Sequence, residues 1–132
     1  MKKVLILCTK NSCRSIVAEA LINKYLNNMR AYSAGIEIAG EIDPYAKQAL
    51  ENEEAWSDEY YSKTLDKIID TEFDLVITVC GDAEEKCPAF PKKVEVIHIG
   101  FENPEGEAFE AYEQSLQEIK EKLLPIVRKK MS

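Results

Sequence analysis

Apolar residues follow two different spacings along the chain, and these spacings alternate. Short, largely apolar runs are typical of strands, and a run that is apolar almost throughout suits a parallel sheet buried on both faces. Between these runs, apolar residues recur every three or four positions, which is the spacing of amphipathic helices. The predicted strands cover residues 3–7, 30–34, 73–79 and 94–100. The predicted helices cover residues 14–28, 43–52, 63–70 and 107–130.

Capping residues and a proline refine two of these helices. Asp43 is a favourable N-cap residue and Pro44 suits a first turn, so a helix is expected to begin there. Pro125 is expected to kink the last helix or to weaken it near its end. The apolar face of that last helix comprises Phe109, Tyr112, Leu116, Ile119, Leu123 and Val127.

The alternation of strands and helices predicts an α/β fold. We expect a single domain over residues 1–132, built as a three-layer sandwich with a central four-stranded parallel sheet. A chain of 132 residues is long enough to bury one hydrophobic core. Parallel sheets bind ligands at the carboxyl ends of their strands, and Cys8 and Cys80 each stand at such an end.

Charge and composition exclude several classes of function. The net charge of −7 argues against nucleic-acid binding, which requires basic surface to displace the counterions of phosphates. No apolar run approaches the ~20 residues of a membrane-spanning helix, and the N-terminus lacks the features of a signal peptide. We therefore expect a cytoplasmic monomer without a membrane or nucleic-acid partner. Cytoplasmic cysteines are usually reduced, so the four cysteines of the chain indicate catalysis or metal binding.

The segment CTKNSCRS at residues 8–15 has the composition of an anion-binding loop. Cys8 directly follows the first strand, and Arg14 stands at the start of the first helix. Loop N–H groups and the positive end of the helix dipole favour a tetrahedral oxyanion, to which Arg14 adds two parallel donors. The same surroundings lower the pKa of a thiol, and Ser15 can donate a hydrogen bond to a Cys8 thiolate. The predicted oxyanion-binding residues are Thr9, Lys10, Asn11, Ser12, Cys13 and Arg14.

Each cysteine also has a simpler interpretation. Cys8 could be a small apolar residue that closes a strand, with Arg14 exposed at a helix start. Cys13 is expected to be a structural thiol packed beneath the loop. Cys80 could be a buried strand end and Cys87 incidental. The four cysteines could also bind zinc, although the second pair lacks the short C-x2–4-C spacing usual at structural zinc sites.

The pattern C-x5-R-S after the first strand resembles the signature of low-molecular-weight protein tyrosine phosphatases and of the arsenate reductases that share their fold. Four segments, in the same order and over nearly the whole chain, resemble the thioredoxin-coupled arsenate reductases in particular. They are CTKNSCRS at 8–15, YSAGIE at 32–37, VCGDAEEKCP at 79–88 and GFENPEG at 100–106. The resemblance implies a low-molecular-weight-phosphatase-like fold and the reduction of arsenate to arsenite.

A relay of three thiols is what this resemblance implies for the mechanism. Cys8 attacks arsenate, and Cys80 then attacks the Cys8 sulfur, which releases arsenite and leaves a Cys8–Cys80 disulfide. Cys87 attacks Cys80 next, and thioredoxin reduces the resulting Cys80–Cys87 disulfide. The resemblance implies no tightly bound cofactor. A phosphatase of this fold needs only Cys8 and Arg14.

The Cys80–Cys87 disulfide imposes a geometric requirement. If residues 80–87 were helical, the two Cα atoms would lie about 10.5 Å apart, whereas a disulfide needs Cα atoms within roughly 7 Å. We therefore expect this segment to bend or unwind on oxidation, which would protect Cys8 and expose the Cys80–Cys87 bond.

The position of the general acid departs from the pattern of these families. The acid is usually the aspartate of an Asp-Pro pair, and Asn103 occupies that position here, with Glu102 as an adjacent substitute. An amide cannot donate a proton at neutral pH. Loss of the acid disfavours phosphatase activity more than arsenate reduction, because arsenate can lose a protonated oxygen of its own as water.

Some relatives also bind a potassium ion beside the anion loop. Asn11, Glu19 and Ser33 match positions of that site. Tyr60 and Ser62, however, stand where a threonine and an aspartate are expected. The resemblance therefore leaves the potassium site in question.

Two other functions fit parts of the sequence. The chain could be a low-molecular-weight protein tyrosine phosphatase that acts through a phosphocysteine intermediate. It could also be a phosphocysteine carrier of a sugar-uptake system, which presents a cysteine loop after its first strand. The carrier gives no role to Arg14 or to the second cysteine pair.

Overall fold

The computed structural model describes residues 1–35, 41–80, 90 and 92–131. Within these residues, the chain forms four strands, three α-helices and one short 3₁₀ helix. The strands are β1 (Lys2–Cys8), β2 (Met29–Gly35), β3 (Leu75–Cys80) and β4 (Val96–Phe101). The helices are α1 (Arg14–Tyr25), α2 (Pro44–Asn52) and α3 (Phe109–Met131), with a short 3₁₀ helix η1 (Leu65–Lys67).

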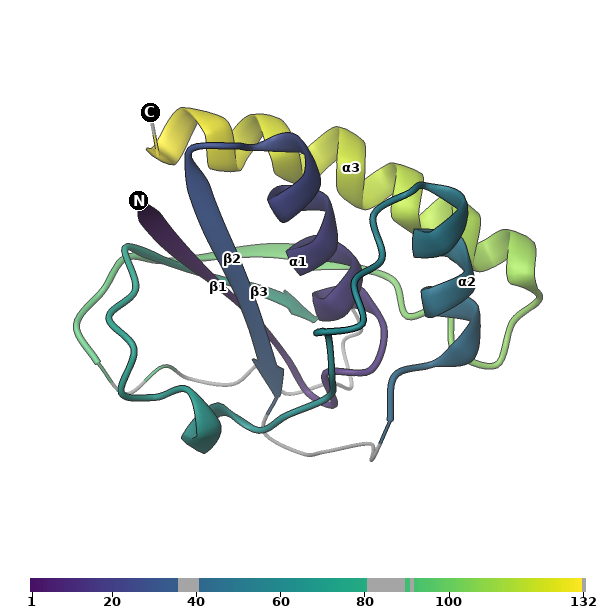
Figure 1. Ribbon diagram of the computed structural model, residues 1–132, viewed down its shortest axis with the longest axis horizontal. Helices are drawn as coiled ribbons and strands as arrows, with labels where there is room; N and C mark the ends of the chain where they lie inside the picture. The colour runs from purple at the N-terminus through teal and green to yellow at the C-terminus, as the bar shows by residue number, and fades with distance from the viewer. Residues whose placement is uncertain (36–40, 81–89, 91, 132) are drawn as a thin grey trace.

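The four strands form one parallel sheet in the order β2-β1-β3-β4 (Figure 1). β1 is an inner strand whose side chains alternate between two cores. Val4 and Ile6 belong to the larger core, and Leu5 and Leu7 belong to the smaller core on the opposite face. Burial of both faces explains why β1 is apolar almost throughout.

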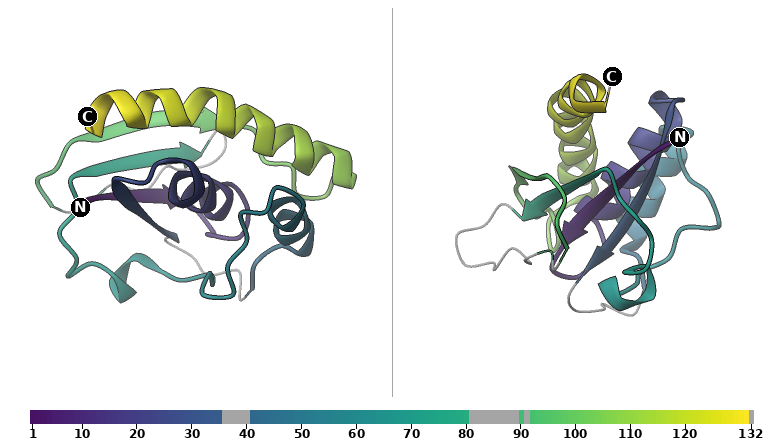
Figure 2. Two further views of the ribbon diagram at one scale, coloured as in Figure 1. Left: turned by 45° about the horizontal axis from the view of Figure 1, so that its top comes forward. Right: turned by 90° about the vertical axis from the view of Figure 1, so that its left-hand side faces the viewer.

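Different elements cover the two faces of the sheet. α1, α2 and α3 contact one another on the face of the larger core (Figure 2). All residues from 14 to 22 of α1 are buried, because this helix lies between the sheet and the other helices. Leu65, Ile68 and Phe73, from η1 and the segment after it, pack on the smaller core. The predicted α/β architecture with a central four-stranded parallel sheet is confirmed.

The predicted helix over residues 63–70 is wrong, and the only helical turn there is η1. The backbone around Lys63 is occupied by other partners. The Gly35 N–H donates to the Lys63 carbonyl at 3.0 Å, and the Lys63 N–H donates to Asn11 Oδ1 at 2.9 Å. Thr64 then forms an isolated parallel bridge with Gly35. In an α-helix the Lys63 carbonyl would accept from the Lys67 N–H, but it accepts from Gly35 instead, so the helical turn begins only at residue 65.

The remaining elements form close to where the sequence predicts them. α1 ends at Tyr25, three residues before its predicted end. Asp43 caps α2 by accepting from the Tyr45 N–H at 3.0 Å, with Pro44 in the first turn, as predicted.

At the C-terminal end of the chain, α3 continues through Pro125 to Met131, so the proline does not end the helix. The predicted apolar face is buried except for Phe109, which is half-buried against the larger core. β4 begins two residues later than predicted and alternates in exposure as an edge strand.

The carboxyl ends of β1 and β3 meet at one edge of the sheet. β1 lies between β2 and β3, so the connections leaving β1 and β3 run to opposite sides and create a topological switch point. Cys8 ends β1 and Cys80 ends β3. Within the described ranges, no helix has the length and apolar character needed to cross a membrane.

Candidate active site

The cysteine loop, residues 8–14, connects the end of β1 to the start of α1. Cys8 and Arg14 are each 4% exposed, and the burial of Arg14 contradicts the simpler interpretation of an exposed arginine at a helix start. Other elements hold the loop by its carbonyl groups. The Asp43 N–H at the start of α2 donates to Ser12 O at 2.9 Å, and the Ser62 hydroxyl donates to Lys10 O at 3.3 Å.

Asn11 fixes the shape of the loop. Its φ is +53°, in the left-handed region that asparagine tolerates better than most residues. The buried side chain makes three hydrogen bonds. Nδ2 donates to Ser15 Oγ at 2.8 Å and to Ser33 Oγ at 2.9 Å, while Oδ1 accepts from the Lys63 N–H. Because the bond from Asn11 uses a lone pair of the Ser15 oxygen, the Ser15 hydroxyl hydrogen remains for a second partner.

Arg14 is fixed at the edge of the sheet. Its Nη1 donates to the carbonyl of Phe101, the last residue of β4, at 2.9 Å. Phe101 pairs with Cys80 across β3 and β4. The guanidinium group therefore lies where the strand ends meet, which is the position that anion binding requires. Because the group is already held in place, it loses little conformational entropy when an oxyanion binds.

Cys13 differs from Cys8 in its surroundings. It is the N-cap residue of α1 and is 4% exposed. Burial raises the pKa of its thiol to about 12, and the carboxylates of Asp43 and Glu105 act in the same direction, against the opposing effect of Arg14. Cys13 is therefore a protonated thiol beneath the loop, in agreement with the structural role predicted for it.

The second cysteine pair is only partly described. The backbone of Cys80 ends β3, next to β1. Cys87 and the predicted bend of residues 81–87 lie outside the described residues. Among the side chains that the structure describes, no three histidine, cysteine, aspartate or glutamate residues gather as a metal site.

The side-chain amide of Asn103 is bonded to the backbone two residues further along the chain. Its Oδ1 accepts from the Glu105 N–H at 3.1 Å and closes a turn. The Glu105 carboxylate instead accepts from the Ser12 hydroxyl at 2.5 Å. Glu102, the substitute acid proposed from the sequence, is exposed. Among the described residues, Glu105 therefore supplies a carboxyl group that binds the loop. Sequence reasoning missed Glu105, because nothing in the local pattern indicates the direction in which the turn points its side chain.

Asn11, Glu19 and Ser33 do come together, in a buried chain of hydrogen bonds beneath the loop. The Ser33 hydroxyl donates to Glu19 Oε1 at 2.6 Å. Burial raises the pKa of Glu19 to about 7, and the Lys63 ammonium is the charge that most opposes this shift. Burial likewise lowers the pKa of Lys63.

In this arrangement Asn11 is not placed to be a ligand of a potassium ion. Cation ligands must be oxygen atoms, yet Asn11 presents its Nδ2 donor to Ser33 and commits its oxygen to Lys63. Lys63 is itself only 6% exposed and already supplies a positive charge to this region.

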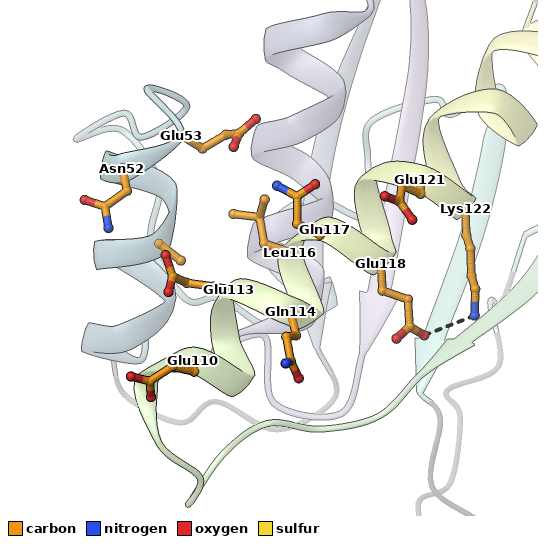
Figure 3. A pocket seen from close by; sticks show the side chains of 11 residues that line it. Asn52, Glu53, Glu110, Glu113, Gln114, Leu116, Gln117, Glu118, Glu121 and Lys122 are labelled. Atoms are coloured by element: carbon orange, nitrogen blue, oxygen red, sulfur yellow. Dashed lines mark hydrogen bonds and ion pairs between the residues drawn. The ribbon is translucent and has the colours of Figure 1, made fainter.

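Two cavities differ in their relation to the loop. A cavity of about 740 Å³ lies between α2 and α3, and no residue of the cysteine loop lines it (Figure 3). Its wall is strongly acidic and includes Glu53, Glu110, Glu113, Glu118 and Glu121, which disfavours an anionic ligand. A second cavity, of about 550 Å³, is lined by aromatic residues and by Ser62, which is bonded to the loop. Its aromatic residues are Trp56, Tyr60 and Tyr61.

The sequence profile of the low molecular weight phosphotyrosine protein phosphatase family matches residues 3–130. The chain belongs to this family. Several relatives of this chain are named arsenate reductases. An arsenate reductase of Bacillus cereus is 38% identical over 123 residues, which covers 92% of this chain and 91% of the relative.

Solved structures agree with this assignment. The arsenate reductase of Archaeoglobus fulgidus superposes with a TM-score of 0.85 at 33% identity, covering 95% of this chain and 98% of the other. A thioredoxin-dependent arsenate reductase of Corynebacterium glutamicum superposes with a TM-score of 0.75 at 26% identity. That match covers 99% of this chain and 62% of the other. The low-molecular-weight-phosphatase-like fold predicted from the cysteine motif is thus confirmed.

Proposed function

We propose that this member of the phosphatase family is an arsenate reductase that uses Cys8, Cys80 and Cys87 in a thiol relay and is recycled by thioredoxin. The observation that carries the proposal is the meeting of Cys8, Arg14 and the end of β3 at one edge of the sheet. The names of the relatives add support, since arsenate reductases match over nearly the whole chain.

In the first step, the Cys8 thiolate attacks the arsenic atom of bound arsenate. A sulfur–arsenic bond forms, and one arsenate oxygen leaves as water after it is protonated. Arg14 and the N–H groups of the loop bind the remaining oxygens and stabilise the negative charge. A hydrogen bond from the Ser15 hydroxyl stabilises the thiolate before attack, while Cys13 takes no part because its thiol stays protonated.

In the second step, the Cys80 thiolate attacks the Cys8 sulfur. The electron pair of the sulfur–arsenic bond passes to arsenic, which leaves as arsenite, and a Cys8–Cys80 disulfide forms. The backbone positions support this step. Leu7 pairs with Thr78 in register, so Cys80 stands one residue beyond the position opposite Cys8. Neighbouring strands lie about 4.8 Å apart, and a disulfide needs Cα atoms within roughly 7 Å.

In the third step, Cys87 attacks Cys80 and regenerates the Cys8 thiolate. The resulting Cys80–Cys87 disulfide is reduced by the two thiols of thioredoxin, which become a disulfide themselves. A thioredoxin-dependent relative with the same fold supports this choice of reductant.

A thioredoxin-coupled assay with NADPH and arsenate tests the proposal. We expect Cys8→Ser, Cys80→Ser and Cys87→Ser variants each to lose turnover, and the matched Cys13→Ser variant to retain it. Mass spectrometry after one turnover without reductant should find one disulfide among Cys80, Cys87 and Cys8. Three free thiols after stoichiometric arsenite release would contradict the relay.

The second candidate function is a protein tyrosine phosphatase, which the family membership and the pair Cys8 and Arg14 favour. Such activity should be low, because Asn103 cannot protonate an alkoxide or phenolate leaving group. An Asn103→Asp variant keeps the acceptor for the Glu105 N–H and restores a carboxyl group at this position. We expect it to hydrolyse an aryl phosphate roughly 10²-fold faster, and an unchanged rate would argue against the missing acid as the cause. Turnover of aryl phosphate that survives Cys80→Ser, with no arsenate reduction by the intact protein, would favour the phosphatase.

A further inference from the structure

Two oppositely charged side chains are buried beneath the cysteine loop. Glu19, in α1, and Lys63, in the segment after α2, are each 6% exposed. They do not form a direct ion pair, yet Lys63 is the strongest favourable charge acting on the Glu19 carboxylate, ahead of Arg30. Burying a carboxylate without a compensating charge costs folding free energy, and Lys63 supplies such a charge to Glu19.

The ammonium of Lys63 occupies a site of the kind that binds cations. Its Nζ donates to the Tyr61 carbonyl at 3.1 Å and lies 4.4 Å from the centroid of the Tyr61 ring. A carbonyl oxygen, an aromatic face and a nearby carboxylate all attract a monovalent cation.

The same two residues connect directly to the loop. The Lys63 N–H donates to Asn11 Oδ1, and Glu19 accepts from Ser33, whose oxygen in turn accepts from Asn11 Nδ2. Asn11 carries the left-handed backbone turn of the loop. The charge balance at Glu19 and Lys63 therefore bears on the shape of the anion-binding site.

We propose that Lys63 is a tethered cation that takes the place of a monovalent metal ion beneath the loop, so that the loop of this chain is held in shape without potassium. Removing the ammonium while leaving its space creates a site that potassium fills. The inference goes beyond the proposed function and does not depend on it, because it concerns the stability and anion affinity of the loop.

Charge and atom type both support this replacement. A potassium ion near Glu19 would lie beside a buried ammonium, and two unit charges of the same sign repel strongly where water is excluded. A covalently attached ammonium loses little translational entropy on binding, whereas a free ion must be taken from solution. Asn11 contributes a donor rather than an oxygen ligand to the Ser33 side of the network.

The test compares thermal unfolding in potassium chloride and in lithium chloride at equal ionic strength, without arsenate. We expect the wild-type Tm to be the same in both salts. Lys63→Ala should lower the Tm by about 10 °C in lithium chloride, and potassium should restore part of that loss. Lys63→Met should lower the Tm without restoration, because its side chain fills the space. Lys67→Ala, an exposed lysine of η1, is the matched control and should behave as wild type in both salts.

Sulfate binding by calorimetry reports on the loop itself. We expect Lys63→Ala to bind sulfate about tenfold more weakly in lithium chloride and with recovered affinity in potassium chloride, which a purely structural role of Lys63 would not produce. If single Lys63 variants fail to fold, the Glu19→Gln/Lys63→Met double variant should fold, since it buries no charge at either position. A wild-type Tm raised specifically by potassium would overturn the proposal. So would a Lys63→Ala variant indistinguishable from Lys67→Ala, or a double variant no more stable than Lys63→Met.

Discussion

Gly35 is the position where one added methyl group should disturb the cysteine loop most directly. Gly35 ends β2 and pairs with Cys8. A Cβ atom built at this position would lie 2.8 Å from Thr9 O, 3.0 Å from Asn11 N and 3.1 Å from Cys8 O. All three are backbone atoms of the loop, so no side chain can rotate away to relieve the contact.

The size of the effect follows from these distances. Ordinary contact of a Cβ atom begins at 3.4 Å, so the contact with Thr9 O at 2.8 Å requires a shift of about 0.6 Å. Overpacking of this kind costs about 1–3 kcal/mol of folding free energy. A displacement of 1 Å in a catalytic constellation costs about 10²-fold in rate, so Gly35→Ala should lose between about 10-fold and 10²-fold in kcat/KM for arsenate.

Calorimetric binding of sulfate and thermal unfolding separate these two effects. Ala31→Val is the matched control, since it adds bulk to the same strand but in the larger core, four residues from the loop. We expect both variants to have a lower Tm, and only Gly35→Ala to bind sulfate more weakly. Unchanged sulfate affinity in a folded Gly35→Ala variant would refute the view that this glycine sets the position of the loop.

Three further experiments probe ionisable groups around the loop. Glu19 has a folded-state pKa raised by burial to about 7, so its contribution to stability is present below about pH 4.5 and is lost as the pH rises through 7. Urea unfolding should show wild type losing about 3 kcal/mol more than Glu19→Gln between pH 4.5 and pH 9, and equal slopes would exclude this assignment. Because the pKa of Cys13 is about 12, alkylation at pH 8 followed by peptide mass spectrometry should leave Cys13 unmodified in the folded protein and modified in urea. Glu105→Gln keeps an acceptor for the Ser12 hydroxyl but removes a negative charge beside the loop, so it should bind sulfate several-fold more tightly at low salt, with a smaller gain at high salt. Glu102→Gln, at an exposed carboxylate, should change the affinity much less, and an equal gain would argue against a special position of Glu105.

Local chemistry made much of the fold predictable from the sequence. β1 is apolar on both faces because it lies inside a parallel sheet, and this pattern is visible in the chain itself. Asp43 and Pro44 mark the start of α2 through interactions with their immediate neighbours. The segment 63–70 misled because helical spacing is a local signal, whereas its backbone is bound by Asn11 and Gly35 from distant parts of the chain.

The sequence by itself determined the cysteine loop, since Cys8 and Arg14 are only six positions apart and a strand followed by a helix fixes their relation. Only the tertiary structure decided which carboxylate and which backbone N–H bind residues of the loop. Glu105 meets Ser12 across 93 positions, and Lys63 meets Asn11 across 52. Contacts between residues so far apart depend on how strands and helices pack, and no local spacing of residue types encodes the direction in which a turn points its side chains.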